Sequence, residues 1–419
     1  MIIGFITLIF MFVMRFQSNN QTFKLNDITL PIGTSATAYT QGDDWYAIVD
    51  DANKILIFNK VDNTLRQTIN IKAKYNKLGQ TDLVVSELCL GTMTWGTQNT
   101  AYDAFYQIEK SMDAGINFID TAELYPVNPI SGATQGESER ILGNWLNKSN
   151  SRDKLIIATK IAGNGPKHIR NGEGINKKSL FTAIEASLKS LKTDYIDLYQ
   201  LHWPNRGSYH FRQNWRFDPT NQDKSKVLDH INEVLEACEV LKKAGKVRAF
   251  GLSNESAWGT AQWLRISEDK NLPRMDSIQN EYSLMCRMFD TDLAELCHND
   301  NVGLLSFSPL ATGILSGKYL DGAVPEGSRG SIVNGLSGRM TSRVDAATRA
   351  YIEVAKKYDL DTCQMALAWC RTRPFMASAI FGARTNEQLS NALDSVNIVL
   401  TEECLRDIEK AHKQNPMPF

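Results

Sequence analysis

The sequence lacks an excess of either charge: 46 lysines and arginines are set against 47 aspartates and glutamates over 419 residues. The basic residues are spread along the chain and form no cluster. A protein that binds nucleic acid broadly presents a strongly basic surface, so this composition argues against a nucleic-acid partner. Hydrophobic residues make up 42% of the chain, which excludes a disordered or fibrous protein.

The sequence also lacks the CxxC and zinc-type cysteine spacings, so we predict no metal site. Its seven cysteines are isolated, and isolated thiols in apolar segments usually behave as small core residues. This usage fits a reducing compartment and predicts a cytoplasmic protein. Nothing in the sequence indicates a membrane partner or a particular oligomeric state.

Residues 1–16 form an apolar run, which is unusual at the start of a cytoplasmic protein. The run is too short to span a bilayer comfortably, and it resembles the apolar part of a signal peptide. However, no lysine or arginine precedes it. Two interpretations stay open: an export or anchor segment, or an upstream extension without a targeting role.

Residues 17–73 differ in pattern from the rest of the chain. Three short runs, 44–49, 54–58 and 64–71, are rich in strand-forming residues and are separated by turn-forming Asp and Asn clusters. They predict a small β-rich extension with an antiparallel sheet. It carries no residues that suggest chemistry, so we assign it no function.

From residue 74 to 419, apolar strands alternate with amphipathic helices. Residues 75–85 first predict a hairpin with Gly79 at its turn. The expected strands are 87–92, 117–120, 155–160, 196–202, 247–252, 276–280, 303–308 and 376–381. The expected helices are 101–115, 136–148, 177–192, 227–245, 257–269, 289–299 and 342–373, the last broken near Asp361. This α/β alternation predicts a (β/α)8 TIM barrel with the hairpin as an N-terminal cap. A G-x-G-x-x-G fingerprint is lacking, which counts against a Rossmann fold.

Four polar residues stand at or just beyond expected strand ends: Asp120, Tyr125, Lys160 and His202. In a parallel barrel the C-terminal ends of the strands meet on one face, where active sites are built. Singly, each residue has an ordinary explanation, such as a turn cap for Asp120 or a satisfied core histidine for His202. Together, at three adjacent strand ends, they indicate an active site.

Several segments carry a resemblance to a known family. They include Gly91-Thr-Met-Thr-Trp95, Phe118-Ile-Asp-Thr-Ala122, Ala158-Thr-Lys160, Leu201-His-Trp-Pro204, Gly251-Leu-Ser-Asn254, Gln279-Asn-Glu-Tyr282, Ser308-Pro-Leu310 and Gly382-Ala-Arg384. In this order they resemble the aldo-keto reductase family over residues 75–419, in particular the bacterial branch related to potassium-channel β subunits. Residues 1–74 lie outside the resemblance.

The resemblance implies an enzyme that reduces aldehydes or ketones with NADPH. Hydride addition to a carbonyl builds negative charge on oxygen, so a proton donor must stand beside it. Tyr125 would be this general acid, and the Lys160 ammonium would lower the phenol's pKa. Asp120 would hold Lys160 in place and charged. His202 would hydrogen-bond and orient the carbonyl of the small-molecule substrate.

The family also implies a cofactor site. Ser253, Asn254 and Gln279 would bind the nicotinamide amide, and Phe307 would stack on its ring. Ser308, Pro309, Leu310, Gly313 and Leu315 would form the pyrophosphate loop. Lys318, Arg329 and Arg384 would supply phosphate charge, with Gly382 beside them. Arg384, before a helix at 387–391, would favour NADP over NAD, and Gln388 would help to bind the adenine. Trp95 and Trp203 would wall the substrate pocket.

Two further interpretations compete with the reductase. The resemblance to channel β subunits permits a non-enzymatic subunit that binds NADPH as a regulator or sensor. A barrel isomerase or aldolase would instead use Lys160 to form a Schiff base with its substrate.

Overall fold

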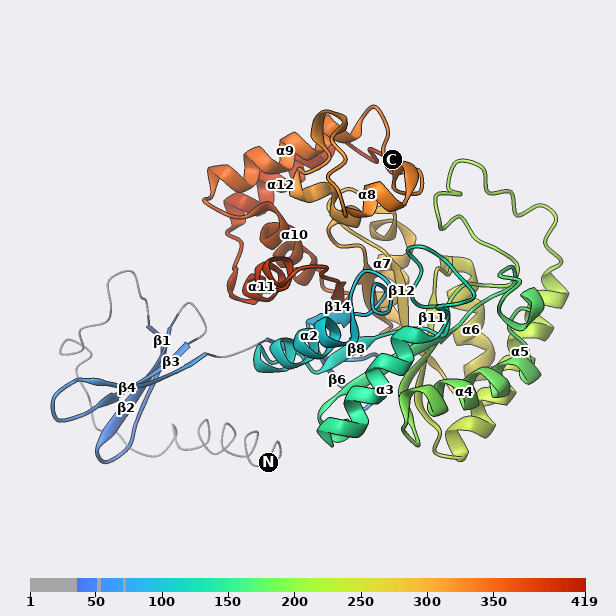
Figure 1. Ribbon diagram of the computed structural model, residues 1–419, viewed down its shortest axis with the longest axis horizontal. Coiled ribbons are helices and arrows are strands. Elements are labelled where there is room, and N and C mark those ends of the chain that lie inside the picture. The colour runs from blue at the N-terminus through green and yellow to red at the C-terminus, as the bar shows by residue number, and fades with distance from the viewer. Residues whose placement is uncertain (1–35, 51–53, 71–72) are drawn as a thin grey trace. The chain divides into compact units, whose positions relative to one another are not determined.

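The computed structural model describes residues 36–50, 54–70 and 73–419. The chain divides into two compact units, Met1–Ile71 and Lys72–Phe419, which are described separately below (Figure 1). The expected apolar segment 1–16 lies outside the described residues. Among the helices of the described ranges, none is long and apolar enough to cross a membrane.

The first unit contains a four-stranded antiparallel sheet with its strands in sequence order. The strands are β1 (Ala36–Gln41), β2 (Trp45–Asp50), β3 (Lys54–Asn59) and β4 (Leu65–Asn70). Alternate residues of β2 and β3, namely Tyr46, Ile48, Leu56 and Phe58, form a small buried cluster. The sequence predicted three of these strands and missed β1, because Ala36-Thr-Ala-Tyr-Thr-Gln41 has no large aliphatic residue.

The second unit is a closed barrel of parallel strands, in which each strand pairs with the next and the last returns to the first. Its strands are β7 (Leu88–Gly91), β8 (Phe118–Asp120), β9 (Ile156–Ile161), β10 (Ile196–Leu201), β11 (Val247–Ser253), β12 (Met275–Glu281), β13 (Gly303–Phe307) and β14 (Met376–Phe381). The predicted (β/α)8 fold is therefore confirmed, and every predicted strand is present.

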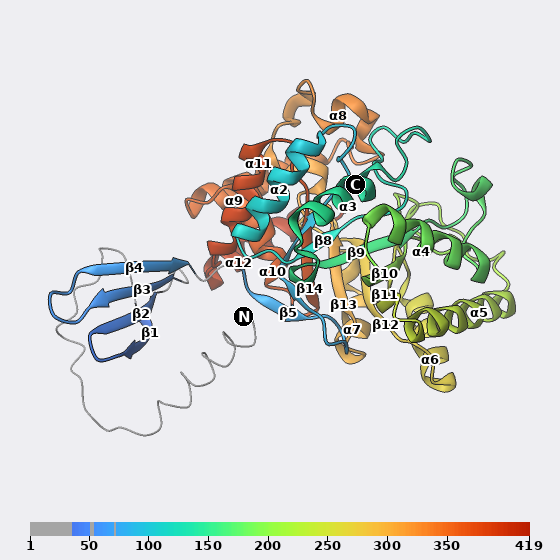
Figure 2. The same ribbon diagram turned by 60° about the horizontal axis from the view of Figure 1, so that its bottom comes forward.

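Helices surround the strands on the outside, as Figures 1 and 2 show. They are α2 (Ala101–Asp113), α3 (Glu137–Ser149), α4 (Lys177–Leu191), α5 (Lys224–Lys243), α6 (Ala257–Lys270), α7 (Asp292–Asn299), α8 (Arg329–Ile332), α9 (Val344–Lys357), α10 (Thr362–Arg371), α11 (Asn386–Asp394) and α12 (Glu402–Gln414). The predicted break near Asp361 is confirmed, because the Asp361 carboxylate caps the start of α10. Helix α12 was not predicted, although its buried Cys404, Ile408 and Ala411 recur at helical spacing.

A hairpin closes the N-terminal end of the barrel. It consists of β5 (Tyr75–Lys77) and β6 (Val84–Ser86), and the Leu78, Leu83 and Val85 side chains join the apolar cluster inside the barrel. Gly79 lies in its turn with φ of +54°, and a Cβ there would lie 2.4 Å from the Asp276 carbonyl oxygen. Only glycine fits this turn without strain. Because the hairpin covers the N-terminal end of the barrel, only the end formed by the C-termini of the strands is left open.

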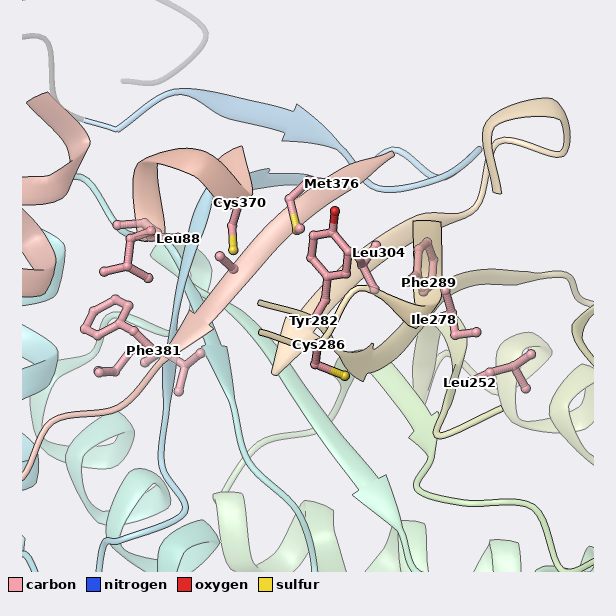
Figure 3. Packing of buried hydrophobic residues seen from close by; sticks show 14 of the residues in the cluster. Leu88, Leu252, Ile278, Tyr282, Cys286, Phe289, Leu304, Cys370, Met376 and Phe381 are labelled. Carbon is pink, nitrogen blue, oxygen red and sulfur yellow. The ribbon is translucent and has the colours of Figure 1, made fainter. Parts of the chain in front are cut away.

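A second apolar layer lies between the strands and the helices, and Figure 3 shows part of it. Tyr282 follows β12, and its ring stacks on that of Trp369 from α10, with centroids 5.3 Å apart. Leu88 and Phe381, on the neighbouring strands β7 and β14, are also fully buried. Each such side chain stabilises the fold by roughly 1.5–3 kcal/mol. This packing fixes the strands that carry the polar residues of the open end.

Candidate active site

The four predicted catalytic residues meet at the C-terminal ends of β8, β9 and β10. Asp120 is the last residue of β8, Lys160 is next to last in β9, and His202 directly follows β10. The strand register places Asp120 beside Ala158 and Lys160 beside Gln200. Tyr125 lies in the loop after β8 and reaches back to the Lys160 ammonium.

Asp120 and Lys160 form a buried ion pair. Nζ of Lys160 lies 2.5 Å from Oδ1 of Asp120 and donates a second hydrogen bond to the Thr121 carbonyl oxygen at 2.8 Å. Oδ2 of Asp120 accepts hydrogen bonds from the amides of Gln200 and Gln279, at 3.0 and 2.8 Å. Both carboxylate oxygens are thus satisfied, which fixes the position of the ammonium.

The third donor position of Lys160 faces the phenol. Nζ of Lys160 lies 3.4 Å from the Tyr125 hydroxyl oxygen. Burial lowers the pKa of Lys160, but the Asp120 carboxylate and Tyr125 outweigh this and raise it overall. Lys160 therefore carries its charge at neutral pH.

Burial dominates the pKa of Tyr125 and raises it above the ordinary phenol value, although the Lys160 charge acts in the opposite direction. The sequence-based expectation of a lowered pKa was thus right about the effect of Lys160 but wrong about the net result. Desolvation of the phenolate by the surrounding protein outweighs the single ammonium. Tyr125 consequently holds its proton at neutral pH, as a proton donor must.

His202 stands edge-on to Tyr125, with ring centroids 5.8 Å apart. The imidazole is 7% exposed, and burial together with the Lys160 charge keeps the pKa of His202 well below its usual value. The ring is therefore neutral. Its Nδ1 is buried and has no hydrogen-bond partner among the described residues.

Asp120, Tyr125 and His202 line a cavity of about 890 Å³, whereas the fully buried Lys160 does not reach its surface. The cavity also brings together most of the predicted cofactor and pocket residues, which are Trp203, Asn254, Gln279, Phe307, Ser308, Pro309, Leu310, Gly313, Lys318, Arg329, Gly382, Arg384 and Gln388. Its size suits a large ligand, since ordinary ligand pockets measure roughly 300–1,000 Å³.

Three of the predicted cofactor and pocket residues lie outside this cavity. The Trp95 indole is fully buried and donates a hydrogen bond to Gln107 of α2 at 2.9 Å, so it packs under the rim instead of walling the pocket. Leu315 belongs to the apolar layer beneath its loop. The Ser253 hydroxyl donates to the Gln279 carbonyl oxygen at 2.9 Å, and Ser253 lines a separate cavity of about 440 Å³.

The cavity can hold an anionic, hydrogen-bonding ligand. Lys318, Arg329 and Arg384 all line it, and none forms an ion pair with another described residue. Burial and the nearby Arg339 lower the pKa of Arg329 to about 10, which leaves it charged at neutral pH. Asn254 Oδ1 and Arg329 Nε are buried without partners among the described residues. Three cations that lack ion-pair partners among the described residues, along one cavity, fit a phosphate-bearing dinucleotide.

Sequence reasoning missed several residues of the site. Gln200 lies near the end of β10, two residues before His202, so strand alternation places it on the same side. Arg212 and Arg339 line the cavity from long loops, where no periodic signal exists. The described residues contain no group of histidine, cysteine or carboxylate side chains able to hold a metal ion.

Comparison with known proteins agrees with this geometry. The model of the Aldo/keto reductase family matches residues 87–413. The chain belongs to the aldo/keto reductase family. Membership makes it an oxidoreductase with a nicotinamide cofactor. A second family model, described only as a family of unknown function, matches residues 1–72.

Three relatives illustrate the spread of the family. Protein tas of Escherichia coli is 40% identical over 348 residues, which cover 82% of this chain and 99% of the relative. The uncharacterized oxidoreductase YrpG of Bacillus subtilis is 31% identical over a match that covers 80% of this chain and 94% of the relative. A probable voltage-gated potassium channel subunit beta of Arabidopsis thaliana is 29% identical over a match that covers 82% of this chain and 98% of the relative.

Proposed function

We propose that this aldo/keto reductase reduces an aldehyde or ketone to the alcohol, with NADPH as reductant and Tyr125 as general acid. The observation that carries the proposal is the buried chain from Asp120 through Lys160 to the phenol of Tyr125. It puts a fixed positive charge beside a proton donor at the wall of a ligand-sized cavity.

The roles follow from the charge that develops on the substrate. When bound, the nicotinamide cofactor supplies hydride to the carbonyl carbon. Tyr125 then donates its proton to the carbonyl oxygen, where negative charge builds. Lys160 stabilises the phenolate left behind, and Asp120 keeps Lys160 charged and in position. Neutral His202 donates a hydrogen bond that orients the carbonyl oxygen.

Arg384 favours NADPH over NADH. Its side chain lies at the cavity, just before α11, and has no ion-pair partner among the described residues. A guanidinium beside a helix N-terminus is suited to a phosphate dianion, which only NADPH carries on its adenosine ribose. The backbone N–H of Arg384 meanwhile donates to the Gln388 side chain at 2.9 Å, which ties the two residues together.

The substrate end of the cavity is apolar and aromatic. Leu124, Val127, Ile130, Trp203 and Phe211 line it around Tyr125 and His202. Such a wall admits carbonyl compounds with a hydrophobic body.

A second candidate is a subunit that binds NADPH without turnover, which the channel-subunit relative favours. The Schiff-base alternative is weaker. Its nucleophile must be a neutral amine, whereas the raised pKa of Lys160 and its ion pair with Asp120 keep the amine protonated.

Turnover separates the two main candidates. The full chain is mixed with NADPH and 4-nitrobenzaldehyde, and loss of NADPH absorbance is followed together with formation of the alcohol. A reductase consumes NADPH and produces 4-nitrobenzyl alcohol in equal amounts. Tight NADPH binding without turnover of this or other aldehydes would favour the regulatory subunit.

A further inference from the structure

A buried charge cluster lies in the cavity wall, apart from the four catalytic groups. Its carboxylate belongs to Glu281, the last residue of β12. Arg339 holds both carboxylate oxygens, with Nε and one terminal nitrogen each at 2.9 Å. A second guanidinium, that of Arg212, lies 2.7 Å from one of the same oxygens. Arg212 and Arg339 both line the cavity.

The cluster has a net charge of +1, because two arginines are paired with a single carboxylate. Burial raises the pKa of Glu281, but the two arginines outweigh this and lower it overall, so the carboxylate is ionised. No second carboxylate within the described ranges pairs with either arginine. Nearby His210 does not alter the balance, because burial lowers its pKa to about 4 and it stays neutral. Two guanidinium groups therefore share one carboxylate.

Arg212 is the member of the cluster with spare binding capacity. Its side chain is 10% exposed, and its Nε is buried without a hydrogen-bond partner among the described residues. One face of the guanidinium packs over the Phe419 ring at 4.9 Å from the centroid. Arg212 shares its only carboxylate partner among the described residues with Arg339, so its buried charge is only partly neutralised, and a second anion would stabilise it.

Aromatic rings connect the neighbour of Arg212 in the chain with the proposed carbonyl site. Phe211, that neighbour, lies edge-on to Trp203, with ring centroids 6.0 Å apart. Trp203 in turn lies beside His202, with centroids 4.9 Å apart. A row of rings thus leads from the proposed carbonyl site to Phe211, the chain neighbour of Arg212, and all of these residues line the same cavity.

We propose that Arg212 binds a carboxylate at the far end of the substrate, so that the substrate is an aldehyde or ketone with a flat apolar body and one negative charge. The inference rests on the proposed carbonyl reduction and names the substrate class of that same site. A carboxylate matches the single uncompensated charge, and its two oxygens fit the guanidinium fork.

A pair of aldehydes of nearly the same shape tests the proposal. 4-Carboxybenzaldehyde is anionic, whereas 4-nitrobenzaldehyde is neutral. The ratio of their kcat/KM values is measured for the full chain and for Arg212→Met. We expect the variant to lower this ratio about tenfold or more, because a charge-assisted hydrogen bond is lost. The intrinsic reactivities of the two aldehydes cancel when the ratios are compared.

Arg216→Met is the matched control, because Arg216 is exposed on the same loop and does not line the cavity. It should leave the ratio unchanged. The Arg212→Met variant should still fold, since Glu281 keeps Arg339 as its partner. An unchanged ratio in Arg212→Met, or an equal drop in Arg216→Met, would overturn the assignment.

Calorimetry separates this inference from the proposed reaction. With NADP⁺ present no aldehyde can be reduced, so binding of 4-carboxybenzaldehyde and 4-nitrobenzaldehyde is measured alone. Preferential binding of the anion, lost in Arg212→Met, supports the Arg212 site even if neither aldehyde is turned over with NADPH. The Arg212 site is refuted if the two aldehydes bind equally tightly, or if the parent chain and Arg212→Met bind 4-carboxybenzaldehyde equally tightly. This holds even if both aldehydes are reduced with NADPH.

Discussion

Nζ of Lys160 lies 3.4 Å from the Tyr125 hydroxyl oxygen while it is ion-paired with Asp120 at 2.5 Å. The lysine is fully buried, so its charge acts on the phenol through protein and not through water. In the proposed mechanism this charge stabilises Tyr125 most strongly after proton transfer, when its side chain is a phenolate.

The protonation states of the site predict a flat pH profile. The pKa of Tyr125 is raised above its ordinary value and that of His202 is lowered well below its own. Both groups therefore keep one protonation state between about pH 7 and 9. We expect kcat for 4-nitrobenzaldehyde, measured at saturating NADPH, to stay constant over this range. A titration step near pH 7 would contradict the assigned neutral histidine and protonated tyrosine.

Arg384 should discriminate between the two nicotinamide cofactors. Arg384→Ala removes a cation that we assign to the 2′-phosphate, so the Kd for NADPH should rise about tenfold or more while the Kd for NADH stays nearly constant. Quenching of tryptophan fluorescence measures both constants. Arg406→Ala, on the exposed face of α12, is the control. Equal losses for NADPH and NADH would remove the 2′-phosphate role.

Glu139 of α3 should make the fold less stable as the pH rises. It is 2% exposed and accepts a hydrogen bond from Thr159 at 2.6 Å, and burial raises its pKa to about 7. An unfolded chain releases this proton near pH 4.5, whereas the folded chain retains it until about pH 7. Stability is therefore lost between these values, by about 3 kcal/mol in total.

Glu139→Gln removes this titration but keeps an oxygen for Thr159. We expect the variant to be more stable than the parent at pH 8, and to gain far less at pH 5. Urea denaturation at the two pH values measures the difference. Glu137→Gln, on the same helix but partly exposed and paired with Arg140, is the control. A pH dependence that is the same in Glu139→Gln and the parent would show that Glu139 is not the group responsible.

The barrel strands were predictable because most are short runs of buried residues that begin with or are rich in apolar side chains, as in Ile156–Ile161, where every residue is buried. The meeting of Asp120, Lys160 and His202 followed from parallel strand order alone. Trp95 was misplaced because sequence position does not reveal that its N–H pairs with the buried Gln107. The direction of the Tyr125 pKa required the extent of burial, and the Arg212 cluster required two long loops to meet at Glu281. No sequence pattern encodes either.

The most direct test of the proposed mechanism is single-turnover reduction of 4-nitrobenzaldehyde by Tyr125→Phe, with NADPH binding measured on the same sample. Tyr102→Phe, at a residue that is 81% exposed, serves as the control. We predict that Tyr125→Phe reduces the aldehyde at least about 100-fold more slowly while its Kd for NADPH stays within about twofold. Reduction at the rate of the parent protein would contradict the role of Tyr125 as the proton donor.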